Sequence, residues 1–572
     1  MMPTDPAPAP LVAALRTIVG PAHVLTGEAE TRRFRSGYRY GEGPVIAVVR
    51  PGSLVEQWRI VRACVAADVS IILQASNTGL TGGSTPDGAG YPGGVVLIST
   101  TRIAGVHVID GGQQVVCLPG ATLYELERTL KPYEREPHSV IGSSCIGASV
   151  LGGVCNNSGG SLVQRGPAFT QLALYAAIRP DGGVDLVNHL GIAINGTPEE
   201  VLAHVERGGF DPAAIAHDPE RWAHDRAYAD HVRQVDADTP ARFNADPRCL
   251  FEGSGSAGKL VLFAVRLDTF PRETGVATFY IGTNDPMQLT RLRREILGSF
   301  ESLPIAGEYI HRTAFDIAAI YGKDTFLAIQ RLGTDRLPGL FALKAKVDTL
   351  VGRLRIFGDH VSDHVMQFAS RLFPHHLPRR MRDYRDRFEH HLMLKMPAAA
   401  IEQTRALLGQ VFSSGEGAFF ECTGEEATKA FLHRFAAAGA AIRYREIHRQ
   451  EVEDIVALDI ALPRNERDWM EILPPEIEGH IIHKLYYGHF FCHVFHQDYI
   501  VRKGVDPIAL EHRMWHLLDD RGAEYPAEHN VGHLYKAKPA LADFYRGLDP
   551  RNQLNPGIGQ TTKQRFWGEK AG

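Results

Sequence analysis

The first 270 residues alternate between strand-like and helix-like hydrophobic patterns. Residues 45–50 and 70–74 are short apolar runs of the length and composition of buried strands, and residues 54–67 repeat apolar positions at helical spacing. Ser53 and Glu56 have the spacing of a capping box, which places the start of that helix at Leu54. We therefore expect a strand, helix, strand unit, followed further along the chain by an alternating strand that covers residues 260–267.

A different pattern begins near residue 271. Residues 276–281 predict a strand, residues 286–300 a helix, and residues 455–462 a further strand. A chain of 572 residues exceeds the size at which single hydrophobic cores stop growing, so two or three domains are expected. The pattern thus predicts an α+β protein with a second domain from about residue 271. It leaves open the place of a polar insertion between about 195 and 248.

Three glycine-rich loops lie beside the predicted strands, at residues 76–86, 141–160 and 253–258. The first offers glycines, hydroxyls and successive backbone N–H groups, a composition suited to wrapping a phosphate. Alone, it is better explained as an ordinary turn cluster, but three such loops favour one extended ligand held by main-chain donors. No G-x-G-x-x-G motif opens a helix after a first strand and no Walker A motif is present, which disfavours the Rossmann and P-loop interpretations.

Composition excludes several classes of protein. Hydrophobic residues make up 44% of the chain and charged residues 22%, the formal net charge is −5, and nothing indicates a nucleic-acid partner. We find no apolar run long enough to span a membrane and no signal-peptide pattern. The seven cysteines form no C-x-x-C pair, which favours reduced thiols. These features predict a protein that is made and kept in the cytoplasm.

The local charge changes sign between about residues 311 and 390. Arginines and lysines outnumber the acidic residues there, although the whole chain is negative, and large apolar residues lie between them. Such a cluster of charged residues usually forms the solvent-exposed face of a helix. The alternative is contact with an anionic membrane surface, where each nearby cation contributes about 1 kcal/mol.

Late in the chain, histidines and a glutamate recur in a pattern that could hold a divalent metal. His489, His493 and His496 lie in an aromatic, β-prone stretch, and Glu528 and His529 follow. Packing of these histidines in a core explains the cluster equally well. Residues seven apart on a regular strand face opposite sides, so His489 and His496 can converge only across a bulge or bend. Without such a bend, His493 would take the place of His496.

Several long strings of this chain resemble, in the same order, the bacterial respiratory quinone-dependent D-lactate dehydrogenases, a flavoprotein family with the vanillyl-alcohol oxidase type of FAD-binding fold. The strings are Asn77 to Pro86, Arg135 to Gly166, Ala430 to Tyr444, Tyr486 to His489, and Pro526 to Tyr535. The resemblance implies an α+β protein with three parts. These are a two-part FAD-binding domain (1–270, completed by 520–572), an α+β cap or substrate domain that covers the flavin (271–310, 390–425 and 450–519), and basic, mainly helical membrane-association segments (311–389 and 426–449).

The resemblance also implies site residues. FAD, bound non-covalently, would contact Ala75, Ser76, Asn77, Thr78, Gly79, Gly83, Ser84, Gly142, Ser149, Gly159 and Val261. One divalent metal, Zn or Mn, would be held by His489, His496 and Glu528, with His529 as the catalytic base. Arg434 would grip the substrate carboxylate through a two-pronged ion pair, whereas surface helix charge is its ordinary meaning. This chain departs from the family pattern in Phe491-Cys492-His493, where family members have Asp-Gly-Asn, and in Asn530, which replaces a glycine.

The function implied is that of a peripheral membrane flavoenzyme on the cytoplasmic face of the inner membrane. It would oxidise D-lactate to pyruvate by hydride transfer to FAD and pass electrons to a membrane quinone, while binding anionic lipid. One alternative is a soluble FAD-dependent dehydrogenase of another D-2-hydroxy acid, 2-hydroxyglutarate or glycolate, with a protein electron acceptor. Another is a flavin-binding scaffold without turnover. The choice of D-lactate rests on the resemblance, because one methylene changes binding by only about 1 to 3 kcal/mol.

Overall fold

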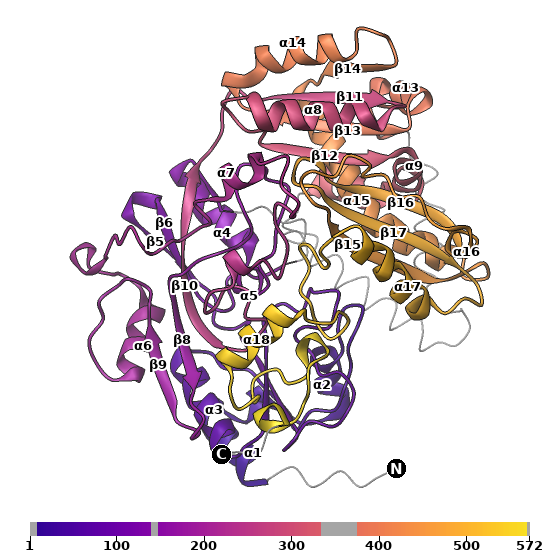
Figure 1. Cartoon of the computed structure of the whole chain (residues 1–572). Helices are drawn as coiled ribbons and strands as arrows, with labels where there is room; N and C mark the ends of the chain where they lie inside the picture. The colour runs from indigo at the N-terminus through magenta and orange to yellow at the C-terminus, as the bar shows by residue number, and fades with distance from the viewer. Residues whose placement is uncertain (1–8, 139–146, 333–374, 569–572) are drawn as a thin grey trace.

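The computed structural model describes residues 9–138, 147–332 and 375–568 (Figure 1). The N-terminal half, in indigo and purple, forms the lower part of the view. Strands from the second half, in pink and orange, form a separate layer above it, and the yellow C-terminal residues return to the lower part. Two β-rich bodies are therefore built from three stretches of chain.

The predicted strand, helix, strand unit is confirmed in the first sheet. It consists of β2 (Ala47–Val49), α3 (Leu54–Ala66) and β3 (Ser70–Gln74). The Ser53 hydroxyl accepts a hydrogen bond from the Glu56 N–H (3.1 Å), so the predicted cap starts the helix. β4 (Val95–Ser99) lies parallel between β2 and β3, and β1 (Val24–Leu25) adds an antiparallel edge. The glycine-rich loop 76–86 leaves this sheet at the end of β3.

A second, antiparallel sheet is organised around β10 (Val261–Pro271), which contains the alternating strand predicted at 260–267. Its path is β5 (Val106–Ile109), β6 (Gln114–Cys117), β10, β8 (Ala173–Ile178) and β9 (Val184–Asn188), and β7 (Arg135–Pro137) also pairs with β10. The short helix α5 (Val150–Cys155) precedes the end of the second glycine-rich loop.

The C-terminal residues pack against the N-terminal sheet. After α18 (Pro539–Leu548), the Ile71 N–H donates to the Gln553 carbonyl (2.9 Å), and the Asn555 N–H donates to the Ile71 carbonyl (2.8 Å). The Asn555 side-chain amide also donates to the carbonyls of Gly83 and Ala257, both at 2.9 Å. The end of the chain thus ties two of the glycine-rich loops together.

The second half of the chain forms an antiparallel seven-stranded sheet, which we call the cap sheet. Its order is β14 (Gly417–Glu421), β11 (Ala277–Thr283), β13 (His390–Met396), β12 (Ala306–His311), β16 (Ile481–His489), β17 (Val494–Arg502) and β15 (Val452–Ala461). The strands predicted at 276–281 and 455–462 are β11 and β15, and the predicted helix is α8 (Pro286–Ser299). The division of the chain into the three predicted parts stays a prediction.

Helices cover both faces of the cap sheet, which is why its strands are apolar almost throughout. On β13, Leu392 and Leu394 pack on one side, with α8, α14 (Ile401–Val411) and α17 (Pro507–Asp520). Met393 packs on the other side, with α9 (Arg312–Tyr321), α13 (Arg379–Arg387) and α15 (Gly424–Ile447). The alternation follows from the two-residue period of a strand. Helix α15 fits closely because its inner face is lined with alanines.

The basic region predicted between 311 and 389 is only partly described. Helices α9, α10 (Lys323–Leu332) and α13 belong to it, whereas residues 333–374 lie outside the described residues. Among the helices that are described, none combines the length and apolarity needed to cross a membrane. The described cysteines, Cys64, Cys117, Cys155, Cys249, Cys422 and Cys492, are all free, as predicted.

Candidate active site

Four neighbouring strands of the cap sheet place two carboxylates and two histidines in one row. The pairing of β12 with β16 sets Glu308 opposite His489, and the pairing of β17 with β15 sets His496 opposite Asp459. Tyr487 lies opposite His496 and two residues before His489, so both histidines share a face. This face is the one that α15 covers. The order across β12, β16, β17 and β15 is therefore carboxylate, histidine, histidine, carboxylate.

A tight hairpin brings His489 and His496 together. Residues 490–492 form a single 3-10 turn, His493 adopts a left-handed backbone with a φ of 53°, and β17 begins at Val494. The two imidazole rings are 5.3 Å apart between centroids. His493 is fully buried elsewhere, with its Nδ1 3.0 Å from the Pro463 carbonyl oxygen. The bend required by the sequence argument is present, and His493 does not substitute for either histidine.

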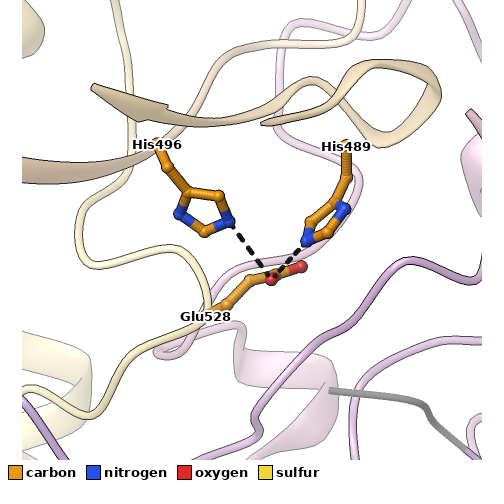
Figure 2. A group of neighbouring side chains, drawn as sticks. All are labelled: His489, His496 and Glu528. Carbon is orange, nitrogen blue, oxygen red and sulfur yellow. Dashed lines mark ion pairs between the residues drawn. The ribbon is translucent and has the colours of Figure 1, made fainter. Parts of the chain in front are cut away.

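Glu528 approaches the two histidines from the C-terminal part of the chain (Figure 2). Its Oε2 lies 3.1 Å from Nε2 of His489 and 4.0 Å from Nε2 of His496. Ligand atoms that bind one ion at about 2.0–2.2 Å are themselves roughly 3–4 Å apart, so this spacing fits a single divalent metal. One ligand atom from each of the three residues lies within 4.8 Å of the others. The structure brings these predicted ligands together, and their role in metal binding stays a prediction.

Charges of opposite sign perturb the pKa values in this cluster. Burial alone would raise the pKa of Glu528, but His489 and Arg242 outweigh it and lower the pKa to about 2. Burial alone would lower the pKa of His489, but Glu308 and Glu528 raise it to about 9. The pKa of His496 stays below its ordinary value because burial dominates there. Without a metal, the cluster is therefore held by an ion pair between His489 and two carboxylates.

Asp459 fixes the short segment that carries Glu528 and His529. Its Oδ2 accepts the backbone N–H groups of Glu528 (2.6 Å) and His529 (2.7 Å), and its Oδ1 lies 3.2 Å from Nδ1 of His496. Burial would raise the pKa of Asp459, but His529 and His496 hold it far below its ordinary value. The His529 ring stacks on His496 at 5.7 Å and its side chain is 36% exposed. His529 therefore lies on the open side of the cluster.

Arg434 reaches the same face from α15. Its Nε lies 2.9 Å from Oε2 of Glu308, close enough for an ion pair although the N–H bond points off the line between the atoms. The guanidinium lies over the Tyr487 ring, 4.8 Å from its centroid. The side chain is 10% exposed, and its buried Nη2 has no hydrogen-bond partner in the described part of the chain. Arg434 is therefore not a solvent-exposed charge on the surface of a helix, which is the usual role of an arginine in such a sequence, because its side chain is buried.

Three residues of the site were missed in the sequence. Glu308 and Asp459 are charged residues inside β-prone stretches, and that contrast was the available signal. Arg242 lies in the polar insertion whose place the pattern left open. Its Nη2 donates to Oε1 of Glu528 and to the Gly160 carbonyl, and its Nη1 donates to the Leu162 carbonyl (3.1 Å). Arg242 thus ties Glu528 to the second glycine-rich loop.

The first glycine-rich loop has the free donors that a diphosphate requires. Within the described residues, the backbone N–H groups of 76–84 donate to no other protein group. Asn77 (φ 52°) and Gly82 (φ 73°) take left-handed backbone angles, which turn successive N–H groups toward one side. These features fit an anionic group such as the FAD diphosphate. Most of the predicted cofactor residues lie in this loop or directly before it: Ala75, Ser76, Asn77, Thr78, Gly79, Gly83 and Ser84.

The loop also packs against the segment that carries Glu528. A Cβ on Gly79 or Gly83 would come within 2.6 Å or 2.7 Å of the Asn530 side-chain amide, and Thr81 Oγ1 donates to the Asn530 carbonyl (2.9 Å). Asn530, one of the residues that depart from the family pattern, therefore contacts the predicted cofactor loop. The loop and the candidate ligand Glu528 are joined through this short segment.

The remaining predicted cofactor residues occupy different positions. Gly159 lies directly against Glu528, since a Cβ there would be 2.3 Å from Oε1. Ser149 caps α5 by accepting the Gly152 N–H (3.1 Å), and the Val261 side chain is buried in the core at the start of β10. Gly142 lies outside the described residues. Contact of each of these residues with FAD stays a prediction.

Two family models match the chain. The model described as "FAD binding domain" matches residues 45–185, and the model described as "D-lactate dehydrogenase, membrane binding" matches residues 278–567. The first match covers the loop with free N–H groups, and the second covers the cap sheet, α15 and Glu528. The chain therefore combines an FAD-binding domain with a domain of the membrane-binding type.

Solved structures show the same fold at low sequence identity. A p-cresol methylhydroxylase has a TM-score of 0.58 with 10% identity and 98% of both chains covered. A 4-ethylphenol oxidase from Gulosibacter chungangensis has a TM-score of 0.55 with 14% identity and 96% of both chains covered. Fold and site together define an FAD-binding protein of the vanillyl-alcohol oxidase type, with an α+β architecture as predicted.

Comparison with named relatives of similar sequence identifies the family within this class. A quinone-dependent D-lactate dehydrogenase of Escherichia coli (strain K12) is 58% identical over 97% of both chains. The protein of that name from Haemophilus influenzae is 57% identical, over 98% of this chain and 99% of its own length. A third, from Corynebacterium glutamicum, is 46% identical over 97% of both chains. The chain belongs to the quinone-dependent D-lactate dehydrogenase family, which confirms the resemblance found in the sequence.

Proposed function

We propose that this protein oxidises D-lactate to pyruvate and passes the two electrons through FAD to a membrane quinone. The observation that carries the proposal is the convergence of Arg434, His529 and the His489, His496 and Glu528 group beside the FAD-binding loops. Family membership over nearly the whole chain supports the substrate and the acceptor, because its relatives are named for them.

The oxidation of a 2-hydroxy acid needs an anchor for the carboxylate, a base for the hydroxyl proton and an acceptor for the hydride. Arg434 is the anchor, because its buried Nη2 is available for a charge-assisted hydrogen bond to a carboxylate. His529 is the base. Its Nδ1 lies 3.6 Å from Oδ2 of Asp459, which leaves Nε2 to accept the proton. FAD, bound non-covalently, supplies the hydride acceptor.

A divalent metal, Zn or Mn, would be held by His489, His496 and Glu528. Such an ion would lower the pKa of the substrate hydroxyl and make the proton easier to remove. Asp459 and Glu308 contact the outer nitrogens of the two histidines, as carboxylates commonly do around metal sites. The same residues therefore orient the ligands and hold the base beside them.

We further propose that the protein binds an anionic lipid surface on the cytoplasmic face of the inner membrane. The match to a membrane-binding family model over residues 278–567 supports peripheral attachment. The basic segments proposed for this contact are 311–389 and 426–449. Within them the Arg379 side chain is 87% exposed, and its contact with Asp383 is a loose surface pair at 3.8 Å that an anionic surface can replace. Attachment of this kind is electrostatic and weakens as salt screens the charges.

Anaerobic reduction of the bound flavin tests the proposed reaction. D-lactate should bleach the flavin absorbance of the purified protein, and L-lactate should not. Replacement of the proposed base, His529→Ala, should slow flavin reduction by about 10² to 10⁴-fold, the usual contribution of a general base, while FAD stays bound. The rate is measured by stopped-flow absorbance. His512→Ala is the matched control, because His512 is exposed on α17 and away from the site.

Each outcome separates the candidates. Faster reduction by D-2-hydroxyglutarate or glycolate than by D-lactate would replace the proposed substrate with that acid. A purified protein that carries no flavin, or a flavin that stays oxidised with every D-2-hydroxy acid, would refute the proposed reaction and favour a scaffold. Equal reduction rates in His529→Ala and the wild type would remove His529 from the mechanism.

A further inference from the structure

Glu308 contacts the two halves of the site with its two different oxygens. Its Oε1 lies 2.5 Å from Nδ1 of His489, and its Oε2 lies 2.9 Å from Nε of Arg434. The side chain is 5% exposed and projects from β12 toward α15, so water cannot readily replace either contact. One buried carboxylate therefore joins the proposed substrate anchor to a proposed metal ligand.

The first contact determines which nitrogen His489 presents to Glu528. A carboxylate accepts a hydrogen bond and cannot donate one, so the hydrogen of a neutral His489 stays on Nδ1. The lone pair then lies on Nε2, which is 3.1 Å from Glu528 and directed toward the proposed metal position. Asp459 lies beside His496 at ion-pair distance, with its Oδ1 3.2 Å from Nδ1 of that ring.

The second contact restricts the guanidinium of Arg434. Glu308 lies at its Nε edge and the Tyr487 ring lies beneath its plane, which leaves the buried Nη2 unpaired within the described residues. A planar guanidinium that is fixed at one edge and one face can meet a substrate carboxylate in a single orientation. The position of the anchor is therefore set by Glu308.

The wider charge pattern gives Glu308 a second effect. Buried charges alternate along the series Arg434, Glu308, His489, Glu528 and Arg242. Removal of the Glu308 charge would leave Arg434 without its carboxylate partner and His489 with only one, in a place where water cannot compensate. Both side chains would then be free to move toward Glu528 or toward the substrate.

We propose that Glu308 is a positioning residue that holds Arg434 and His489 in register, so that substrate carboxylate and metal are bound at a fixed separation. This inference rests on the proposed function, since it takes Arg434 as the anchor and His489 as a ligand. It adds that the two binding events are coupled through one carboxylate. Neither oxygen of Glu308 needs to touch the substrate or the metal.

The test compares Glu308→Gln with the wild-type holoenzyme. An amide can accept from His489 or from Arg434 with its single oxygen, but it cannot serve both cations. We expect an increase of about tenfold or more in KM for D-lactate or in the dissociation constant for Mn²⁺, in line with the usual effect of an outer carboxylate. Mn²⁺ binding to chelator-treated protein is measured by electron paramagnetic resonance, a readout that is independent of turnover.

A double-mutant cycle separates positioning from a general structural effect. Once Arg434→Met has removed the anchor, Glu308→Gln should raise KM by less than twofold further, because there is no anchor left to position. Glu308→Asp, which keeps the charge, should recover part of the loss and also serves if the Gln variant does not fold. Glu471→Gln is the matched control: it neutralises another buried carboxylate, which contacts Tyr486 and Tyr499 outside the site.

The results distinguish this inference from the proposed function. If wild-type flavin is not reduced by D-lactate, the proposed function fails whatever Glu308 does. If wild-type flavin is reduced but Glu308→Gln changes both constants by less than twofold, positioning by Glu308 is refuted. Additive effects of Glu308→Gln and Arg434→Met would refute it as well, because independent residues add.

Discussion

At the scale of single residues, the candidate site is a set of buried charges that hold one another in place. Each histidine of the row has a carboxylate behind it, Glu308 for His489 and Asp459 for His496. Glu528 is held by Arg242 on its other oxygen. Buried charges are stable only when paired, so the loss of one partner affects the next residue in the series. The site should respond to pH through these pairs.

Glu528 gives a pH dependence with a defined sign. Its pKa is about 2 in the folded protein and 4.5 ordinarily, so its carboxylate stabilises the fold above pH 4.5, and this contribution is lost as the pH falls toward 2. In chelator-treated protein, we expect the difference in unfolding temperature between wild type and Glu528→Gln to shrink as the pH falls from about 6 to about 3. Differential scanning calorimetry measures both unfolding temperatures.

Glu471→Gln provides the opposite control for that experiment. Burial raises the pKa of Glu471, so its ionised form opposes folding and protonation at low pH favours the folded state. The unfolding temperature of the wild type minus that of Glu471→Gln should therefore rise as the pH falls over the same range, whereas the corresponding value for Glu528→Gln should fall. A difference for Glu528→Gln that stays constant down to pH 3 would contradict a lowered pKa at Glu528.

The sequence predicted which residues form the candidate site better than it predicted which residues contact them. His489, Glu528, His529 and Arg434 were recognised because they lie in strings shared with a family, and His496 because it belongs to the histidine cluster around His489. The structure brings these five residues together. Glu308, Asp459 and Arg242 were missed because their partners in the site lie far along the chain: His489 is 181 residues from Glu308, Glu528 is 69 from Asp459, and Glu528 is 286 from Arg242. Strand register and loop packing create such contacts, and neither has a local pattern.

At the scale of elements, the hairpin between β16 and β17 and the loop after α5 place the ligands. The strands predicted from alternation and the helices predicted from caps were correct at α3, α8, β10 and β11, because those patterns are local. The hairpin turn was not predicted, since Phe490, Phe491 and Cys492 are not among the residues that usually form turns. Loop 156–160 packs against the Glu528 side chain at Gly159, and we expect this contact to position the carboxylate.

Gly159→Ala tests that contact. A Cβ at this position would lie 2.3 Å from Oε1 and 2.6 Å from Cδ of Glu528, so the carboxylate must move. A displacement of about 1 Å at a site of this kind can slow the reaction roughly 10²-fold, and we expect at least a tenfold decrease in the rate of flavin reduction by D-lactate. Stopped-flow absorbance measures the rate, and absorbance of the purified protein measures FAD content.

Gly153→Ala is the matched control for this substitution. Gly153 lies in α5, six residues earlier, and a Cβ there would meet only the Cβ of Ala168 at an ordinary 3.6 Å. Alanine is also the better helix former, so this variant should fold and react like the wild type. If the two alanine variants reduce flavin equally fast, loop 156–160 does not position Glu528.

At the scale of the whole molecule, the cap sheet is formed by the middle of the chain, and the residues before and after it pack together in the other β-rich body (Figure 1). The return of the chain to this body places Glu528 and His529 below strands that precede them and lets Asn555 join two of the glycine-rich loops. The cap sheet also carries the helices α9, α13 and α15 of the proposed membrane-association segments. The same face of the cap sheet therefore carries the side chains of the candidate site and packs against these helices.

Lipid binding is the prediction that belongs to this scale. The protein should co-sediment with vesicles of phosphatidylglycerol and phosphatidylcholine at low salt and be released at high salt. Lys344→Glu with Lys346→Glu should weaken binding at least about 30-fold, since each lost cation costs about 1 kcal/mol. Lys131→Glu with Lys536→Glu makes the same charge change at two exposed positions outside the basic segments. Equal losses in both pairs would contradict binding by these segments.

The amino-acid sequence alone was sufficient to predict the α+β class, the strand and helix patterns near the glycine-rich loops and, through the strings shared with the family, the FAD cofactor, and it proposes the reacting side chains. These properties reside in local periodicity, in caps and in continuous strings of residues. The tertiary structure was needed to show that Glu308 lies opposite His489, that Arg242 contacts Glu528, and that His493 points away from the site toward Pro463. Such contacts depend on strand register and on the return of the chain, which bring Glu308 to His489 across 181 residues and Arg242 to Glu528 across 286.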